Sequence, residues 1–107
     1  MMYEISKESF KQRLEERLNF QFIDVTDTLK NSIESYKDVH RVLFNTQFLA
    51  EIKSKNIGIN TNVIIFSLDK HSKDAKKAAE LLKSEGFHFV YFYIGNPEDV
   101  ILEKGLN

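Results

Sequence analysis

The feature that most constrains the fold is a near-continuous apolar run, Val63 to Leu68, that leads through a short polar loop into a helical pattern. A strand that is apolar on both faces is typical of a parallel sheet covered by helices on both sides. From about Ser72 to Glu85, alanines and leucines recur at helical spacing, and Gly86 is placed to end that helix. The run and the helix together predict one β-α unit of a parallel sheet.

The rest of the chain alternates between strand and helix patterns in the same way. Strands are predicted over Met2–Ile5, Phe20–Val25, Arg41–Phe44 and His88–Ile94. Helices are predicted over Lys7–Leu18 behind a Ser6 N-cap, from Thr26 or Asp27 to Ser35, from a Thr46 cap through Ile52, and from Pro97 to about Lys104. Strands joined by helices form right-handed crossovers. We therefore expect a three-layer α/β/α sandwich around a mostly parallel five-stranded sheet, with residues 1–107 as a single domain.

Composition excludes several classes of chemistry. The sequence contains no cysteine, which rules out disulfides, thiolate metal sites, thiol nucleophiles and persulfide carriers. The net charge of −1 gives no overall attraction to nucleic acid or to an anionic membrane. No apolar run approaches the ~20 residues that span a bilayer, and the first residues lack the apolar core of a signal peptide. A cytoplasmic location is therefore expected.

The loop after the apolar run is the leading candidate for a functional site. Ligands of open α/β sheets bind at the carboxyl ends of the strands, and a helix N-terminus at that edge favours an anion. The loop and the first helical turn contain Asp69, Lys70, His71, Ser72, Lys73 and Asp74. The plainer interpretation is a capped helix start, in which Ser72 is the N-cap and Asp74 complements the helix dipole.

A second carboxylate is expected at the same edge of the sheet. Asp24 ends the second predicted strand, and together with Asp69 it could supply the paired carboxylates of a hydrolase. An Asp at such a position more often caps a helix or fixes a loop through backbone amides. The three histidines lack the spacing of a helical metal site, so we expect no metal and no other cofactor; they are His40, His71 and His88.

The helix that follows the loop has a basic side. Its lysines are Lys70, Lys73, Lys76, Lys77 and Lys83, and its acids are Asp74, Glu80 and Glu85. Several of these acids stand three or four residues from a lysine, which usually indicates a solvated face with local ion pairs. The aromatic run Tyr91–Tyr93 is not interleaved with basic residues, so no single-stranded nucleic acid partner is expected.

Taken in order, these segments resemble the rhodanese-like domain over nearly the whole chain. The segment FIDV, Phe22–Val25, is similar to the family's "lIDVR", with Thr26 where an Arg is common, and YKDVHRVLFN occupies the place of "GHIpGAinip". The segment AAELLKSEGF is similar to the helix "AaxxLxxxGF". Near the end of the chain, Gly95-Asn96 replaces the family's paired glycines, and Ile101 falls near its usual Trp.

The resemblance implies an active-site loop of the form CxxGxRS, whose Cys carries sulfur in active members. Alignment on Ala78-Ala79 places that Cys at Asp69, with Ser72 at the Gly and Asp74 at the Arg. Ser67 is the alternative position, which would leave the loop two residues too long. A carboxylate cannot carry sulfane sulfur. The resemblance therefore implies a catalytically inactive domain that acts as a binding or regulatory module and not as an enzyme.

Further expectations concern partners and the loop itself. We expect a protein partner at the loop edge and the basic side of the helix, with a small anion at the loop as a second expectation and the oligomeric state left open. We also expect the Asp69 carboxylate to accept several loop amides and so fill the anion nest from within. The open alternative is a small hydrolase or phosphoryl-handling enzyme that uses Asp69 with Asp24.

Overall fold

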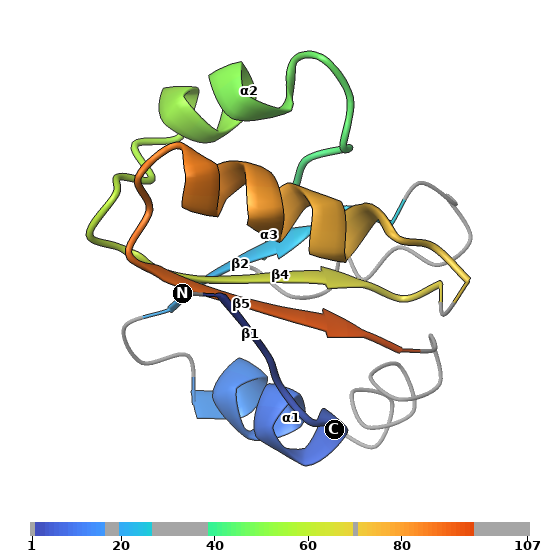
Figure 1. Ribbon diagram of the computed structural model, residues 1–107. Helices are drawn as coiled ribbons and strands as arrows, with labels where there is room; N and C mark the ends of the chain where they lie inside the picture. The colour runs from blue at the N-terminus through green and yellow to red at the C-terminus, as the bar shows by residue number, and fades with distance from the viewer. Residues whose placement is uncertain (1, 17–19, 27–38, 70, 96–107) are drawn as a thin grey trace.

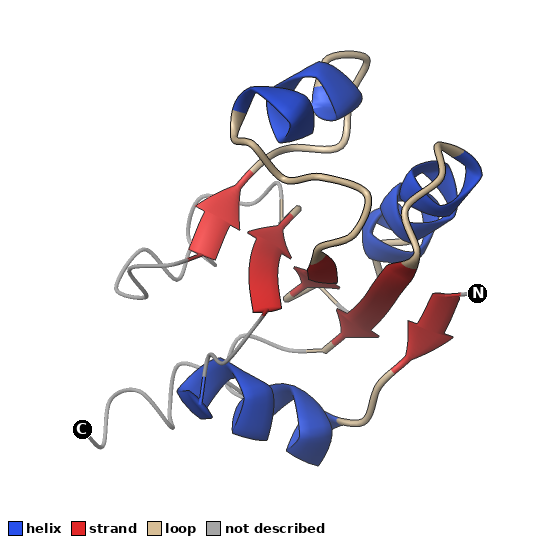
Figure 2. Cartoon of the chain, turned by 90° about the vertical axis from the view of Figure 1, so that its left-hand side faces the viewer, coloured by secondary structure: helices blue, strands red, loops and turns tan. Residues whose placement is uncertain are grey.

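The computed structural model describes residues 2–16, 20–26, 39–69 and 71–95, and within them a five-stranded sheet is covered by helices on both faces (Figures 1 and 2). The strands are β1 (Met2–Glu4), β2 (Phe20–Asp24), β3 (Val39–Arg41), β4 (Asn62–Ser67) and β5 (Phe89–Ile94). The helices are α1 (Lys7–Glu16), α2 (Phe48–Ser54) and α3 (Asp74–Ser84). None of these helices is long and apolar enough to cross a membrane.

The sheet has the strand order β1-β5-β4-β2-β3, and every recorded pair of neighbouring strands is parallel. The apolar run predicted as a covered strand is β4, which lies in the centre and pairs with both β2 and β5. Helix α1 packs on one face of the sheet, and α2 and α3 lie on the other (Figure 2). The predicted three-layer α/β sandwich is therefore confirmed.

The two faces of the sheet are filled with different side chains. On the α2 and α3 face, small and branched residues dominate, because Ala75, Ala78 and Ala79 let α3 approach the strands closely. On the α1 face, rings dominate: Phe10 of α1 stacks on Tyr93 at 4.5 Å between centroids and lies 4.9 Å from Phe66. The alternation of side chains along the strands thus produces two separate cores.

Several predicted boundaries agree with the structure. The Ser6 hydroxyl accepts the amide of Ser9 at 3.1 Å, which is the N-cap bond expected for α1. Gly86 has a φ of 97° and ends α3, as its position in the sequence predicts. The helices expected over 26–35 and 97–104 fall almost wholly outside the described residues.

Two local predictions are wrong. The third strand is Val39–Arg41 and not Arg41–Phe44, because Val42 and Phe44 pack into the α2 and α3 core after the strand has ended. Apolar pattern alone does not separate a strand from a packed turn that follows it. Thr46 does not cap α2: the side chain of Asn45 accepts the amide of Gln47 at 2.8 Å instead.

Candidate functional site

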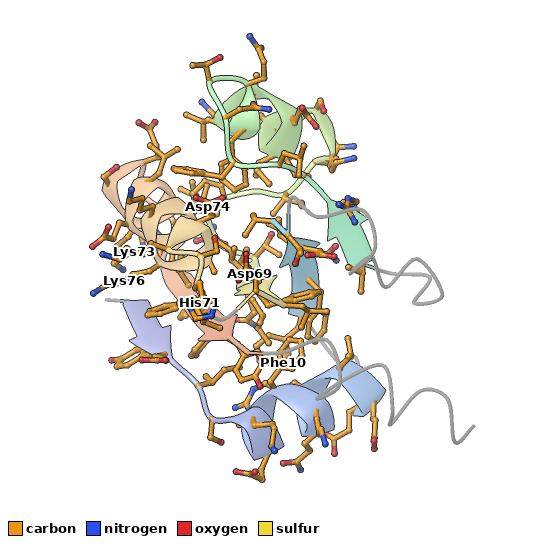
Figure 3. All side chains as sticks on the ribbon, turned by 90° about the vertical axis from the view of Figure 1, so that its right-hand side faces the viewer. Phe10, Asp69, His71, Lys73, Asp74 and Lys76 are labelled. Atoms are coloured by element: carbon orange, nitrogen blue, oxygen red, sulfur yellow. The ribbon has the colours of Figure 1, made fainter. Side chains whose placement is uncertain are left out.

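The candidate site lies where the strands end at the carboxyl edge of the sheet. We call residues 68–73, between β4 and α3, the β4–α3 loop. Beside it lie the ends of β2 and β5, since Asp24 pairs with Phe66 and Ser67 pairs with Ile94. Figure 3 shows Asp69 close to the sheet and Lys73 and Lys76 extending away from the start of α3.

Ser67, the last residue of β4, and Leu68, the first residue of the loop, are held by buried hydrogen bonds, and we call these two residues the loop root. The amide of Leu68 donates to the Thr26 hydroxyl at 2.9 Å, which ties the loop to the end of β2. The carbonyl of Ser67 accepts the amide of Gly95 at 3.0 Å, which ties it to the end of β5. Ser67, Leu68 and Thr26 are all buried, so these bonds replace solvent for the backbone.

Asp24 supports the loop root indirectly, through a hydrogen bond to Thr26. It is 1% exposed, and its Oδ1 accepts the amide of Thr26 at 2.8 Å. Burial raises the pKa of Asp24 above its usual value, while the hydrogen bonds from Thr26 and the charge of Arg41 oppose that rise. An Arg41 Nη2 donates to the Thr26 carbonyl at 2.8 Å, and its Nη1 is buried without a partner in the described part of the chain.

The role of Asp24 is therefore internal. Its carboxyl group is withdrawn from solvent and fixes the backbone of Thr26, as the plainer interpretation of the sequence predicts for an Asp at a strand end. A paired-carboxylate site needs two side chains that reach a substrate. The structure gives that arrangement no support, because Asp24 is enclosed while Asp69 is half-buried in the loop.

The remainder of the loop, which we call the loop tip, comprises Asp69, His71, Ser72 and Lys73; Lys70 lies outside the described residues. The Asp69 carboxylate accepts the amide of His71 at 3.0 Å. The amide of Ser72 instead bonds to the Asp69 carbonyl at 2.9 Å, and the amide of Asp74 bonds to the Ser72 hydroxyl at 3.1 Å.

The expectation of a carboxylate surrounded by several loop amides is therefore corrected. One described amide reaches the Asp69 side chain, and two others are used in a turn and at the helix start. This is an Asx turn of the kind that fixes many loops. Ser72 bonds the first residue of α3, although the residue that directly precedes the helix is Lys73.

The geometry distinguishes the two positions proposed for the family's Cys. Ser67 is fully buried within the end of β4, and its hydroxyl lies 3.3 Å from the amide of Asp69. Asp69 follows the strand and is half-buried at the start of the loop. Of the two side chains, that of Asp69 is the more exposed.

The other titratable candidates are dispersed. His40 lies on β3 within 2.8 Å of the Gln21 side chain, His71 is exposed in the loop tip, and His88 is exposed before β5. In the described part of the chain, no three His, Asp or Glu side chains are grouped so as to hold a metal. Lys73, directly before α3, and Lys76 and Lys77 in its first turn are exposed.

The sequence pattern assigns no site role to Thr26 or Arg41, although Thr26 bonds to the loop root and Arg41 bonds to Thr26. The pattern offers Thr26 as a helix cap, whereas its hydroxyl accepts the amide of Leu68, 42 residues further along. Arg41 stands beside an apolar run, and a lone cation in such a place is the signal that could have identified it. The bond between distant residues depends on sheet order, which local pattern does not supply.

Comparison with known proteins establishes the fold. No protein-family model and no curated protein matches the sequence. Seven solved chains resemble it, among them one each from Wolinella succinogenes, Bacillus halodurans and Saccharomyces cerevisiae. The polysulfide-sulfur transferase homodimer from Wolinella succinogenes has a TM-score of 0.72 and 20% identity, over 97% of this chain and 75% of that one.

The other two structures come from a bacterium and a yeast. The BH2092 protein from Bacillus halodurans has a TM-score of 0.69 and 19% identity, over 95% of this chain and 73% of that one. An uncharacterized protein from Saccharomyces cerevisiae has a TM-score of 0.70 and 18% identity, over 96% of this chain and 93% of that one. The chain therefore has a rhodanese-like sulfurtransferase fold but no cysteine to carry sulfur. Identities this low show the fold alone.

Proposed function

We propose that this chain is a non-catalytic, rhodanese-fold binding module that contacts a protein partner through the loop tip and the start of α3. The observation that carries the proposal is the pairing of a sulfurtransferase-type fold with a chain that contains no cysteine. Sulfur transfer in this fold needs a thiolate that accepts and releases sulfur. A carboxylate at Asp69 cannot take that part.

The condition of the loop supports a binding role over a different chemistry. Its root keeps its buried hydrogen bonds, so the loop is still held in a defined conformation. Its tip is half-buried or exposed, which leaves side chains available to a partner. A rigid base with an accessible tip is the arrangement that recognition loops use. A small anion at the tip is a weaker proposal, since the amides of His71, Ser72 and Asp74 are already bonded within the loop.

Sulfur transfer from thiosulfate or mercaptopyruvate to cyanide is the first test. The purified chain is expected to show no turnover above the protein-free blank. Asp69→Cys, which places a thiol at the accessible position, is expected to gain some transfer, and Ser67→Cys is the matched control because its side chain is buried. Turnover by the unaltered chain would overturn the proposal.

Phosphatase activity is the second test, because it addresses the carboxylate alternative. Hydrolysis of p-nitrophenyl phosphate with Mg²⁺ is expected to stay at the blank level. Activity that disappears in Asp69→Asn would replace the binding proposal by an enzymatic one. We further propose that the module acts in the cytoplasm, which cell fractionation with an antibody to the chain would check.

A further inference from the structure

The charges between Asp69 and Lys77 are mixed in the sequence but separated in the structure. This stretch contains four lysines and two aspartates. Asp69 and Asp74 are half-buried, whereas Lys73, Lys76 and Lys77 are exposed. The surface that a partner would meet here is therefore basic, although the whole chain has a net charge of −1.

The lysines are also not neutralised by neighbours on their own helix. The described part of the chain records no ion pair for Lys73, Lys76 or Lys77, so the pairs expected from the spacing of the acids are not formed. The Asp69 carboxylate is bonded to the amide of His71 instead. The positive charge at the start of α3 is therefore available for an outside anion.

The three side chains form a compact group, which we call the lysine face. Lys73 directly precedes α3, and its carbonyl accepts the amide of Lys77 at 3.0 Å, so the two residues lie about 6 Å apart on one side of the helix start, with Lys76 beside them. Figure 3 shows Lys73 and Lys76 pointing outward next to His71 of the loop tip. The lysine face thus adjoins the loop through which a partner is proposed to bind.

We propose that the lysine face docks a short acidic segment of the partner protein, a run rich in Asp and Glu. This inference rests on the proposed binding role and specifies the chemistry of the partner. In an extended peptide, alternate side chains point the same way and repeat at about 6.6 Å. That repeat matches the ~6 Å spacing along the helix. Lysines suit this task because their point charges do not demand one fixed geometry.

The surroundings of the lysine face favour an acidic peptide over a nucleic acid. Glu80 is exposed one turn further along α3, and Asp69 stands at the other end of the group. These carboxylates limit the basic surface to little more than one helical turn, which is too short to follow a phosphate backbone. The loop tip also offers no Phe, Tyr or Trp side chain on which a base could stack, and His71 is its one aromatic ring among the described residues.

The test measures binding of a short fluorescein-labelled polyglutamate peptide to the full chain by fluorescence anisotropy, at low and at physiological salt. Lys73→Gln/Lys77→Gln is compared with Lys53→Gln/Lys55→Gln, a matched double variant that removes the same charge from exposed positions at the end of α2. The α3 variant is expected to bind about fivefold more weakly than the unaltered chain, and the α2 variant to bind unchanged. Binding should weaken as salt is raised.

Three results would overturn the inference: no binding of polyglutamate by the unaltered chain, equal loss in both double variants, or tighter binding of a thymidine oligonucleotide than of the peptide. Thermal unfolding of each variant establishes that it is folded before binding is compared. The sulfur-transfer and phosphatase assays do not depend on this surface. A negative result in the polyglutamate binding test therefore does not contradict the proposed function. Activity in the sulfur-transfer or phosphatase assay would contradict the proposed function without involving the lysine face.

Discussion

The root and the tip of the β4–α3 loop differ in what holds them. At the root, Leu68 bonds to Thr26 just after β2 and Ser67 bonds to Gly95 just after β5, and both partners are buried. At the tip, Asp69 and Ser72 bond to residues within the loop or at the start of α3, in half-buried or exposed positions. The conformation of the root depends on bonds between distant parts of the chain, whereas the conformation of the tip depends on bonds between near neighbours in the sequence.

This difference indicates at which positions a substitution should leave the stability of the fold unchanged. A substitution at the root disturbs bonds between strands and should lower the free energy of unfolding. A substitution at the tip should leave the fold intact and alter only what the loop binds. A loop of this kind can therefore keep its conformation while its surface changes, because the two properties depend on different residues.

The largest effect is expected at Gly95, whose amide bonds to the carbonyl of Ser67 in the loop root. A Cβ at Gly95 would lie within 2.6 Å of three atoms of the Tyr93 side chain, and that ring is stacked on Phe10. Gly95→Ala is therefore expected to lower the free energy of unfolding by about 3 kcal/mol in urea denaturation. Gly58→Ala is the control, since nothing lies within 4 Å of its added Cβ; equal effects of the two would contradict the comparison.

Replacement of Thr26 by Val removes the hydroxyl that bonds to the loop root and leaves the side-chain volume nearly unchanged. Thr26→Val leaves the buried amide of Leu68 without its acceptor, so we expect a loss of about 1–3 kcal/mol in the free energy of unfolding. Thr26→Ser keeps the acceptor and should lose clearly less. If Val and Ser were equivalent at this position, the bond to Leu68 would not be what fixes the root.

The buried carboxyl of Asp24 should make the free energy of unfolding depend on pH. Burial raises its pKa in the folded state above the usual 3.8, so the folded chain holds this proton more tightly than the unfolded chain. The contribution of Asp24 to stability therefore falls as pH rises from 3.8 through the folded pKa. Asp24→Asn keeps an oxygen for the Thr26 amide and removes the titration.

The measurement is the free energy of unfolding of both proteins across the acid range. The value for the unaltered chain minus that for Asp24→Asn should decrease as pH rises, and the subtraction removes the other carboxylates. A difference that increases with pH would mean that Arg41 and Thr26 outweigh burial.

The smallest effect is expected at the tip. Asp69→Ala removes one hydrogen bond, to the amide of His71, at a position that water can reach. The loss in the free energy of unfolding should be below about 1 kcal/mol, less than a multi-amide nest would give. Asp69→Asn, which keeps the acceptor, should be near neutral. A loss as large as that of Thr26→Val would erase the distinction between root and tip.

The general architecture was predictable because each central element has a clear period. The apolar run of β4, the alanine face of α3 and the terminating Gly86 specify a β-α unit without any help from the rest of the chain. Edge elements were less predictable: β3 has three residues, and the apolar Val42 after it resembles a continuing strand. Short elements at an edge receive much of their definition from packing.

The candidate site was predictable in place but not in detail. A loop after a central parallel strand lies at the carboxyl edge whatever its sequence, so Asp69 to Asp74 could be located in advance. The link from Thr26 to Leu68 could not, because it joins residues that follow two adjacent strands and that no local pattern connects. The destination of each loop amide likewise depends on turn geometry that the residue types permit but do not fix.

The pairing of β1 with β5 has a consequence for how the chain is made. Met2 aligns with Val90, so the first strand cannot dock until the last strand of the sheet has left the ribosome. During synthesis, the N-terminal segment must wait without its neighbour while β2 and β4 can already associate. Contacts between such distant parts of a sequence slow folding, and completion of the β1 edge should therefore be the late step in maturation of this protein.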